Sequence, residues 1–271
     1  MAGAFRADER YDLDITKFIF LIESTPTLSH DATLLRLADT CLLWSHRLSE
    51  WCGHGPALEE DIALTNTALD VIGQARTLLQ LAASRGAADA TEDTLAYFRK
   101  PQDFHNLMMA ALPNGDYAHT IARSFLLSAW FVPVWESLVI GSDTALSAIA
   151  ANAVKEARVQ LRHAGDWVIR FGDGTAESRD RIEAAFTALW PYCDELMRVA
   201  IVGTDVGADQ SNRNARWWQT VQRTFELATL DARDPLFEPI TATLTAAAHA
   251  HRAALLTEMQ SLARQHPGAV W

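Results

Sequence analysis

Helical chains can carry redox chemistry on two irons, held by a Glu from each of two helices and a Glu-x-x-His from each of two others. That spacing places both ligands of a motif on one inward face of a helix. The chain has nine histidines, and none of them follows a Glu at this distance. The nearest match is Asp116-x-x-His119, directly after a glycine. An Asp in this position is typical of a helix N-cap, so we expect Asp116 to start a helix.

Other pairs of reactive residues give weaker patterns. Glu50 and His54 are four residues apart, but glycines at 53 and 55 break a helix between them, which favours a turn over a site. No Gly-x-Ser-x-Gly nucleophile elbow occurs. A metal site improvised from Glu50, His54, Asp116 and His119 remains an alternative.

His163 and Asp166 lie among Arg158, Arg162 and Arg170. This pattern favours a solvated or partner-facing surface of ion pairs over a binding site. Binding of a CoA ester through the three arginines is a further hypothesis.

The elements that must position these residues are helices, because apolar residues recur at helical spacing along most of the chain. Long helices are expected at about 31–51, 57–84, 116–139 and 143–171. Short helices broken at Pro101 are expected in 91–112, and further helices in 176–202, 212–230 and 235–265. The helix at 57–84 is apolar nearly all round, with Leu58, Ile62, Leu69 and Ile72 on one side. We therefore predict that it lies in the middle of the bundle, buried on several sides.

The composition fits one helical domain. Of the 271 residues, 49% are hydrophobic, which is ample for a core, and the 13 Gly and 9 Pro are too few for a turn-rich β fold. We predict a helical domain at 29–271 and an N-terminal extension at 1–28.

The charge excludes several partners. With 23 Lys and Arg against 34 Asp and Glu, the formal net charge is −11, and no cluster of bases is visible in the sequence. We therefore expect no nucleic acid and no membrane as partner. The longest uncharged apolar stretch, Ser124–Trp135, is far shorter than the roughly 20 residues of a membrane span. The charged first residues do not resemble a signal peptide, and three cysteines without a Cys-x-x-Cys pair predict a reduced, cytoplasmic protein.

Nine tryptophans are a marked excess for a chain of this length. Packing within a helical bundle is one explanation. A surface that binds another protein is the second, because Trp is enriched where proteins bind proteins.

Five separate segments resemble the PaaC family, the non-catalytic subunits of a bacterial phenylacetyl-CoA epoxidase. They are His46–Pro56, Glu59–Ala63, Ala68–Arg76, Pro113–Arg123 and Gly165–Thr175. The resemblance runs from about Leu34 to the Pro267-Gly268 tail. It implies a ferritin-like helical bundle with additional C-terminal helices. It also implies a partner subunit of the same fold that carries the di-iron centre.

In the iron subunit the corresponding helices carry Glu-x-x-His motifs. Here the second helix has Val71-x-x-Gln74, and the fourth has Ala157-x-x-Gln160. All four residues fall on core-facing stripes. Valine and alanine cannot ligate iron, and the third helix has Ser124 and Ser128 where an acid is expected. Glu50 is the one carboxylate that matches a surviving ligand. We therefore expect a hydrogen-bonded or dry core at these degenerate positions, with no metal.

The resemblance implies a structural and interaction subunit of a multicomponent, NADPH-dependent phenylacetyl-CoA 1,2-epoxidase (monooxygenase) complex in aerobic phenylacetate catabolism. Its partners are the di-iron catalytic subunit and other oxygenase components, including the reductase. The chain alone is expected to have no catalytic, cofactor-binding or metal-binding residues. The alternative is a self-sufficient ferritin-like metal enzyme with a non-standard site.

Overall fold

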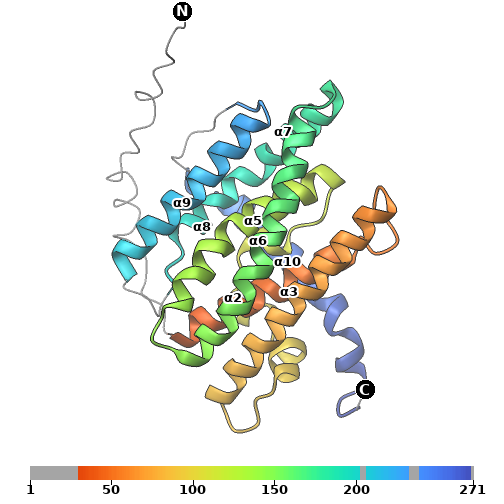
Figure 1. Ribbon diagram of the computed structural model, residues 1–271. Coiled ribbons are helices and arrows are strands. Elements are labelled where there is room, and N and C mark those ends of the chain that lie inside the picture. The colour runs from red at the N-terminus through yellow and green to blue at the C-terminus, as the bar shows by residue number, and fades with distance from the viewer. Residues whose placement is uncertain (1–29, 202–205, 232–237, 270–271) are drawn as a thin grey trace, which may run out of the picture.

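The computed structural model describes residues 30–201, 206–231 and 238–269, which form an all-α fold without a strand among them (Figure 1). The α-helices are α2 (His30–Ser49), α3 (Leu58–Arg85), α4 (Met108–Ala111), α5 (Tyr117–Val139), α6 (Thr144–Gly172), α7 (Ala176–Leu189), α8 (Cys193–Arg198), α9 (Val206–Leu227) and α10 (Ala242–Gln265). Short π or 3₁₀ turns lie at η1 (Thr94–Phe98), η2 (Pro101–Asp103) and η3 (Trp190–Tyr192).

Helix α5 is the central helix of the bundle. Every residue from Ala118 to Leu138 is buried except His119 and Glu136. Helices α2 and α3 form one antiparallel hairpin and α5 and α6 form a second, and Trp44 of α2 stacks on Phe131 of α5 with ring centroids 5.9 Å apart. Helices α7 and α9 cover the remaining side of α5. This arrangement confirms the predicted ferritin-like helical bundle.

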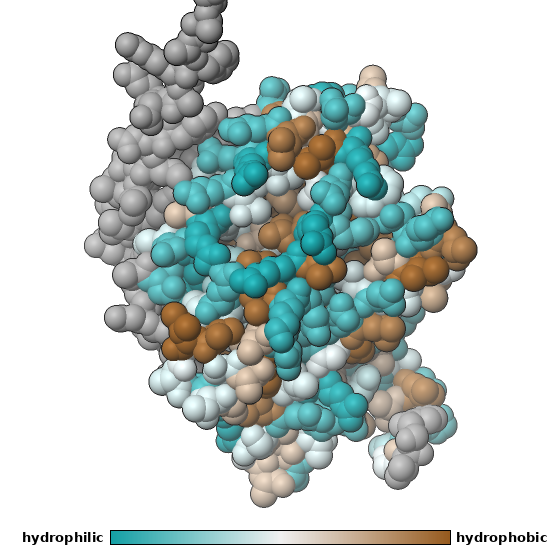
Figure 2. Space-filling view, viewed as in Figure 1, coloured by the Kyte–Doolittle hydropathy of each residue, from teal (hydrophilic) through white to brown (hydrophobic). Residues whose placement is uncertain are grey.

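The prediction that the second long helix is buried on several sides is wrong. Helix α3 buries one face, while Leu58, Ile62, Leu69 and Ile72 are 73%, 51%, 62% and 36% exposed. We call these four residues the α3 stripe. Figure 2 shows apolar side chains between hydrophilic ones on the side where α3 and α6 face the viewer. Periodicity identified both apolar sides correctly, but only one of them has a neighbour among the described helices.

Side-chain caps start several helices where the sequence changes from turn to helix. Asp116 accepts the backbone N–H of His119 at 2.9 Å, which confirms its predicted role as the N-cap of α5. Asp143 caps α6 in the same way through the N–H of Leu146. Each cap satisfies a backbone donor that the first turn leaves unpaired.

The segment between α3 and α5 is held by polar groups of α2. Asp39 is fully buried and forms an ion pair with Arg99, whose Nη1 lies 3.0 Å from Oδ2. The same carboxylate accepts the N–H of His105 at 2.8 Å. The next residue of α2, Thr40, accepts the N–H of Leu107 at 3.0 Å. Burial raises the pKa of Asp39, and the bonds from Arg99 and His105 oppose that rise.

Helices α8 and α10 also form hydrogen bonds to this segment. Glu195 of α8 accepts the N–H of Met108 at 2.7 Å, and burial raises the pKa of its carboxyl to about 7. Arg252 of α10 donates to the carbonyl of Phe104 at 3.0 Å, and Gln260 donates to that of Arg99 at 3.1 Å. Side chains of three helices thus replace the backbone bonds that a regular element would make.

The tryptophan excess is explained largely by the core. Trp44, Trp130, Trp135, Trp217 and Trp218 are at most 4% exposed. Trp51, Trp167 and Trp190 are half-buried and pack against the same core. Trp271 lies outside the described residues. The hypothesis of a tryptophan-rich partner surface therefore gains no support from the eight tryptophans described.

Helices α6 and α9 run side by side and parallel (Figure 1). A Cβ added at Gly172 would lie 2.2 Å from the carbonyl oxygen of Ala228, so only glycine allows the backbones to approach this closely. The two helices are therefore held at a short, fixed separation at their C-terminal ends.

Among the described residues, no helix has the length and apolarity needed to span a membrane. Among the described residues, Cys41, Cys52 and Cys193 form no disulfide with one another. The predicted N-terminal extension, 1–28, lies outside the described residues, so the domain boundary at residue 29 remains a prediction.

Replacing Arg99 by Met should leave the Asp39 carboxylate buried without its cation. We expect the free energy of unfolding to fall by about 3–5 kcal/mol, measured by denaturant unfolding, because an unpaired buried charge is costly. Arg76→Met is the control, since its ion pair with Glu92 is long and Arg76 is 70% exposed. It should change stability by less than about 1 kcal/mol. Equal small losses in both variants would contradict the role given to Asp39.

Candidate functional site

The four degenerate positions lie in the core, as predicted. Val71 and Gln74 are on the buried face of α3, and Ala157 and Gln160 are on the buried face of α6. Their i, i+3 spacing places each pair on one turn of its helix, facing the interior. The two helices pack directly against each other.

A chain of hydrogen bonds crosses the bundle at this level. The Cys41 thiol of α2 donates to Gln74 Oε1 at 3.8 Å, and Gln74 Nε2 donates to Glu156 Oε2 of α6 at 2.7 Å. Burial, together with the charge of Glu156, raises the pKa of Cys41 far above its usual range. The thiol is therefore a neutral donor, and the chain of bonds contains one carboxylate.

This donor set is poor for iron. Val71 and Ala157 offer no ligand atom, and Gln74 already uses its amide oxygen and nitrogen in hydrogen bonds. Across the part of the chain that the structure describes, no three His, Cys, Asp or Glu residues are grouped so as to hold a metal ion. Iron sites of this fold need several carboxylates and imidazoles converging from four helices.

Three buried polar groups of α5 and α6 near these positions make fewer hydrogen bonds than Gln74 does. The amide nitrogen of Gln160 and the hydroxyls of Ser124 and Ser128 are buried, with no hydrogen-bond partner among the described residues. The serines occupy the helix α5 positions where the resemblance places an acid. Small neutral groups cost less to leave unpaired in a core than a carboxylate does.

Glu50 does not face the core, so its match to a surviving iron ligand is wrong. It is 40% exposed, pairs with Arg47 at 2.6 Å, and accepts from the Asn114 amide at 2.9 Å. Asn114 in turn bonds to the fully buried guanidinium of Arg123, whose pKa is lowered to about 9 by burial and by Arg47. These side chains fix the turn before α5.

The other residues of the improvised metal site also have separate places. His54 is exposed in the predicted turn after α2, where Gly53 has φ +81°. Asp116 caps α5, and its second carboxylate oxygen pairs with Arg181 of α7 at 3.4 Å. Among the described residues, the structure therefore does not join Glu50, His54, Asp116 and His119 into one set of ligands.

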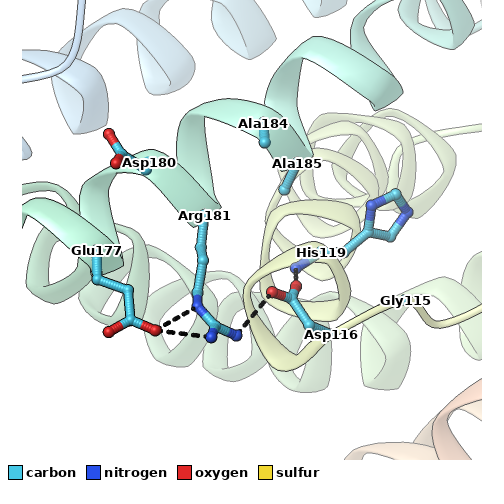
Figure 3. A pocket seen from close by; sticks show the side chains of 8 residues that line it. All are labelled: Gly115, Asp116, His119, Glu177, Asp180, Arg181, Ala184 and Ala185. Atoms are coloured by element: carbon cyan, nitrogen blue, oxygen red, sulfur yellow. Dashed lines mark hydrogen bonds and ion pairs between the residues drawn. The ribbon is translucent and has the colours of Figure 1, made fainter.

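An open groove of about 470 Å³ lies between the start of α5 and α7 (Figure 3). Its polar lining comes from Asp116, His119, Glu177, Asp180 and Arg181. Arg181 points between two carboxylates and pairs with Glu177 at 2.7 Å as well as with Asp116. The cation is thus already paired within the groove, and burial lowers the pKa of His119. The groove presents excess negative charge and offers no anion site.

A buried polar contact that sequence reasoning missed joins three helices. Glu60 of α3 accepts the hydroxyl of Tyr117 of α5 at 2.6 Å and lies 2.9 Å from Nε2 of His163 of α6. Burial alone would raise the pKa of Glu60, but these two contacts outweigh it and lower the pKa. Burial and the Glu60 carboxylate raise the pKa of Tyr117. The partners are 57 and 103 residues apart, so no local pattern indicates the contact.

Of the predicted solvated or partner-facing surface of ion pairs around His163, the structure confirms only that His163 pairs with an acid, Glu60 of the same chain. Its ring is half-buried between α6 and α3. Trp51 and Trp167 meet the Tyr117 ring edge-on, with centroids 5.8 and 5.3 Å away. Arg170 lies over the Trp167 ring at 5.1 Å. The cluster connects the N-terminal ends of α3 and α5 to the C-terminal half of α6.

Comparison with known proteins places nearly the whole chain in one family. Residues 24–271 match the PaaA/PaaC family, described as phenylacetic acid catabolic protein. This chain belongs to that family. A curated relative, the C subunit of 1,2-phenylacetyl-CoA epoxidase from Escherichia coli (strain K12), is 39% identical over 246 residues. The match covers 89% of this chain and 98% of that relative. Both findings confirm the resemblance seen in the five segments.

The two glutamines of this PaaA/PaaC family member provide a matched test of its core. Gln74→Leu should lower the free energy of unfolding by about 1–3 kcal/mol, because Glu156 loses a donor and Cys41 loses an acceptor. Gln160→Leu removes an amide nitrogen that has no partner among the described residues, so it should change stability by less than about 1 kcal/mol. Denaturant unfolding of both variants measures the difference, and a larger loss for Gln160→Leu would refute the assignment.

Proposed function

We propose that this chain is the structural C subunit of a phenylacetyl-CoA epoxidase complex in aerobic phenylacetate catabolism. It holds the di-iron catalytic subunit and has no metal site or catalytic residues of its own. The observation that carries the proposal is the replacement of both Glu-x-x-His motifs by Val71-x-x-Gln74 and Ala157-x-x-Gln160 in an intact helical core. The relative from Escherichia coli, which is named as the C subunit of such an epoxidase, supports it.

The physical chemistry of the core favours this role. Carboxylates buried without a metal would repel one another and cost several kcal/mol each. Neutral side chains at the same positions allow the bundle to fold without an ion. The bond from Gln74 to Glu156 ties α3 to α6 across the level where the resemblance places iron ligands in the partner.

The α3 stripe supports an interaction role. Its four exposed side chains are large and aliphatic, and Val159 on the neighbouring helix α6 is 53% exposed. Figure 2 shows apolar groups on this side of the molecule, separated by hydrophilic ones. Exposed apolar side chains that share one surface are typical of protein–protein contacts. The α3 stripe is therefore the surface that we assign to the di-iron subunit.

The proposal includes the other oxygenase components, with a reductase that supplies electrons from NADPH, and a cytoplasmic location. It includes no nucleic acid and no membrane as partner. No observation favours the alternative of a self-sufficient metal enzyme, since no three of its four residues are grouped among the described residues, and Asp116 caps α5 and pairs with Arg181. Arg158 binds Glu136 and Arg170 lies over the Trp167 ring, so two of the three arginines named for a CoA ester already have separate partners within the chain.

Iron content tests the absence of a metal site. The chain purified alone from iron-replete cells should contain far less than one iron per chain by elemental analysis. The iron subunit purified in parallel is the positive control. Two irons per chain in this protein would overturn the interpretation of Val71, Gln74, Ala157 and Gln160.

Leu69→Glu tests the proposed interface. Leu69 is 62% exposed, so the substitution should leave the unfolding temperature nearly unchanged. We expect it to weaken binding of the di-iron subunit at least tenfold, measured by isothermal titration calorimetry, because a charge would be buried at the contact. Leu262→Glu on α10, where Leu262 is 53% exposed, is the matched control. Equal affinities for the two variants would refute the assignment of the α3 stripe.

A further inference from the structure

Basic side chains that are distant in the sequence meet where α6 and α9 lie side by side. Arg158 of α6 donates to Glu136 at 2.6 Å, and Arg216 of α9 pairs with the other oxygen of the same carboxylate. Burial alone would raise the pKa of Glu136, but the two arginines outweigh it and lower the pKa. One anion therefore serves two cations, whose side chains remain 58% and 46% exposed.

Three more bases extend this surface. Lys155 and Arg162 lie three residues before and four residues after Arg158, and Arg223 lies seven residues after Arg216. These spacings place each set on one side of its helix. All three side chains are exposed, and none forms an ion pair within the described ranges. We call Lys155, Arg158, Arg162, Arg216 and Arg223 the basic face.

The basic face brings together bases that form no cluster in the sequence, because they come from two helices. The acids on or beside it are Glu136, Asp166 one turn beyond Arg162, Glu226 one turn beyond Arg223, and Asp209 seven residues before Arg216, which pairs with Arg213. Five cations outnumber them, so the face has local positive charge on a chain whose net charge is −11. In Figure 2, strongly hydrophilic side chains cover the middle of α6 toward α9.

The shape of the face favours a protein over a small anion. Seven residues of helix span about 10 Å, so the cations are spread along two parallel helices and do not converge on one point. A phosphate or a CoA ester is held by donors that converge on it. An extended surface carrying several carboxylates can meet all five cations at once.

A second copy of this chain is a poor occupant. Two basic faces in contact would repel each other. A basic face set against the acidic groove of Figure 3 on another copy closes into a dimer only if one two-fold axis pairs both patches at once, and otherwise builds rings or open filaments. An acidic protein is repelled by most of the surface of this acidic chain and attracted by the basic face. This difference fixes the orientation in which it binds.

We infer that the basic face of α6 and α9 docks an acidic surface of a protein component other than the di-iron subunit. This rests on the proposed function, because it takes the chain to be one subunit of an assembly. The face shares no residue with the α3 stripe, and its Arg158 and Arg216 meet at Glu136 where α6 and α9 lie side by side.

The test uses the full chain with Arg162→Glu and Arg223→Glu combined. Binding is measured by biolayer interferometry to the di-iron subunit, the reductase and each remaining protein component, one at a time, at low and high salt. We expect one component other than the di-iron subunit to bind at least tenfold more weakly to the variant, and to bind the unmodified chain more weakly at high salt. Affinity for the di-iron subunit should be unchanged.

Lys100→Glu with Arg181→Glu is the control, since it changes the net charge equally at exposed positions elsewhere. It should leave every affinity unchanged. The inference is overturned if no component distinguishes the two variants, if the di-iron subunit is the one that is lost, or if phenylacetyl-CoA or DNA is what the basic face binds. If the di-iron subunit does not bind the unmodified chain, the proposed function is refuted instead. The affinities of the other components for the two variants can still be compared in that case.

Discussion

The Asp39 carboxylate has no exposed surface, and the segment between α3 and α5 supplies the groups that bind it. Arg99 supplies its cation, and the N–H of His105 supplies a further bond. The segment that carries both has little regular structure, so its path is set by side chains. Helix α10 then bonds to the carbonyls of this segment, which makes the position of the C-terminal helix depend on a charge in the first described helix.

Much of the helical fold follows from the sequence because its signals are local. Asp116 and Asp143 cap the helices that the glycine-containing turns before them predict. What local signals cannot show is which side of a helix another helix covers. The α3 stripe has the spacing of a buried face, yet the helix that packs on all sides is α5. Apolar periodicity reports that a face needs a neighbour without reporting whether that neighbour belongs to the same chain.

In the candidate site, too, some residues could be placed from local sequence signals and others could not. Val71, Gln74, Ala157 and Gln160 could be placed in the core because each lies on a periodic stripe. Glu50 could not, because it lies just beyond the end of α2, where Arg47 of the last turn and Asn114 set its orientation. The contact of Glu60 with Tyr117 and His163, and the sharing of Glu136 by two arginines, join residues that no window of sequence contains together. Tertiary packing creates these contacts, and the sequence records them only as isolated polar residues.

Gly172 links packing to the electrostatic field of the molecule. The backbones of α6 and α9 touch there because the residue has no side chain. A larger residue at position 172 would have to push the Ala228 carbonyl, and with it the C-terminal end of α9, away from α6. The separation of the two helices that carry the basic face therefore depends in part on a residue that has no charge and no side chain, so mutating charged residues alone would not identify every position that shapes this surface.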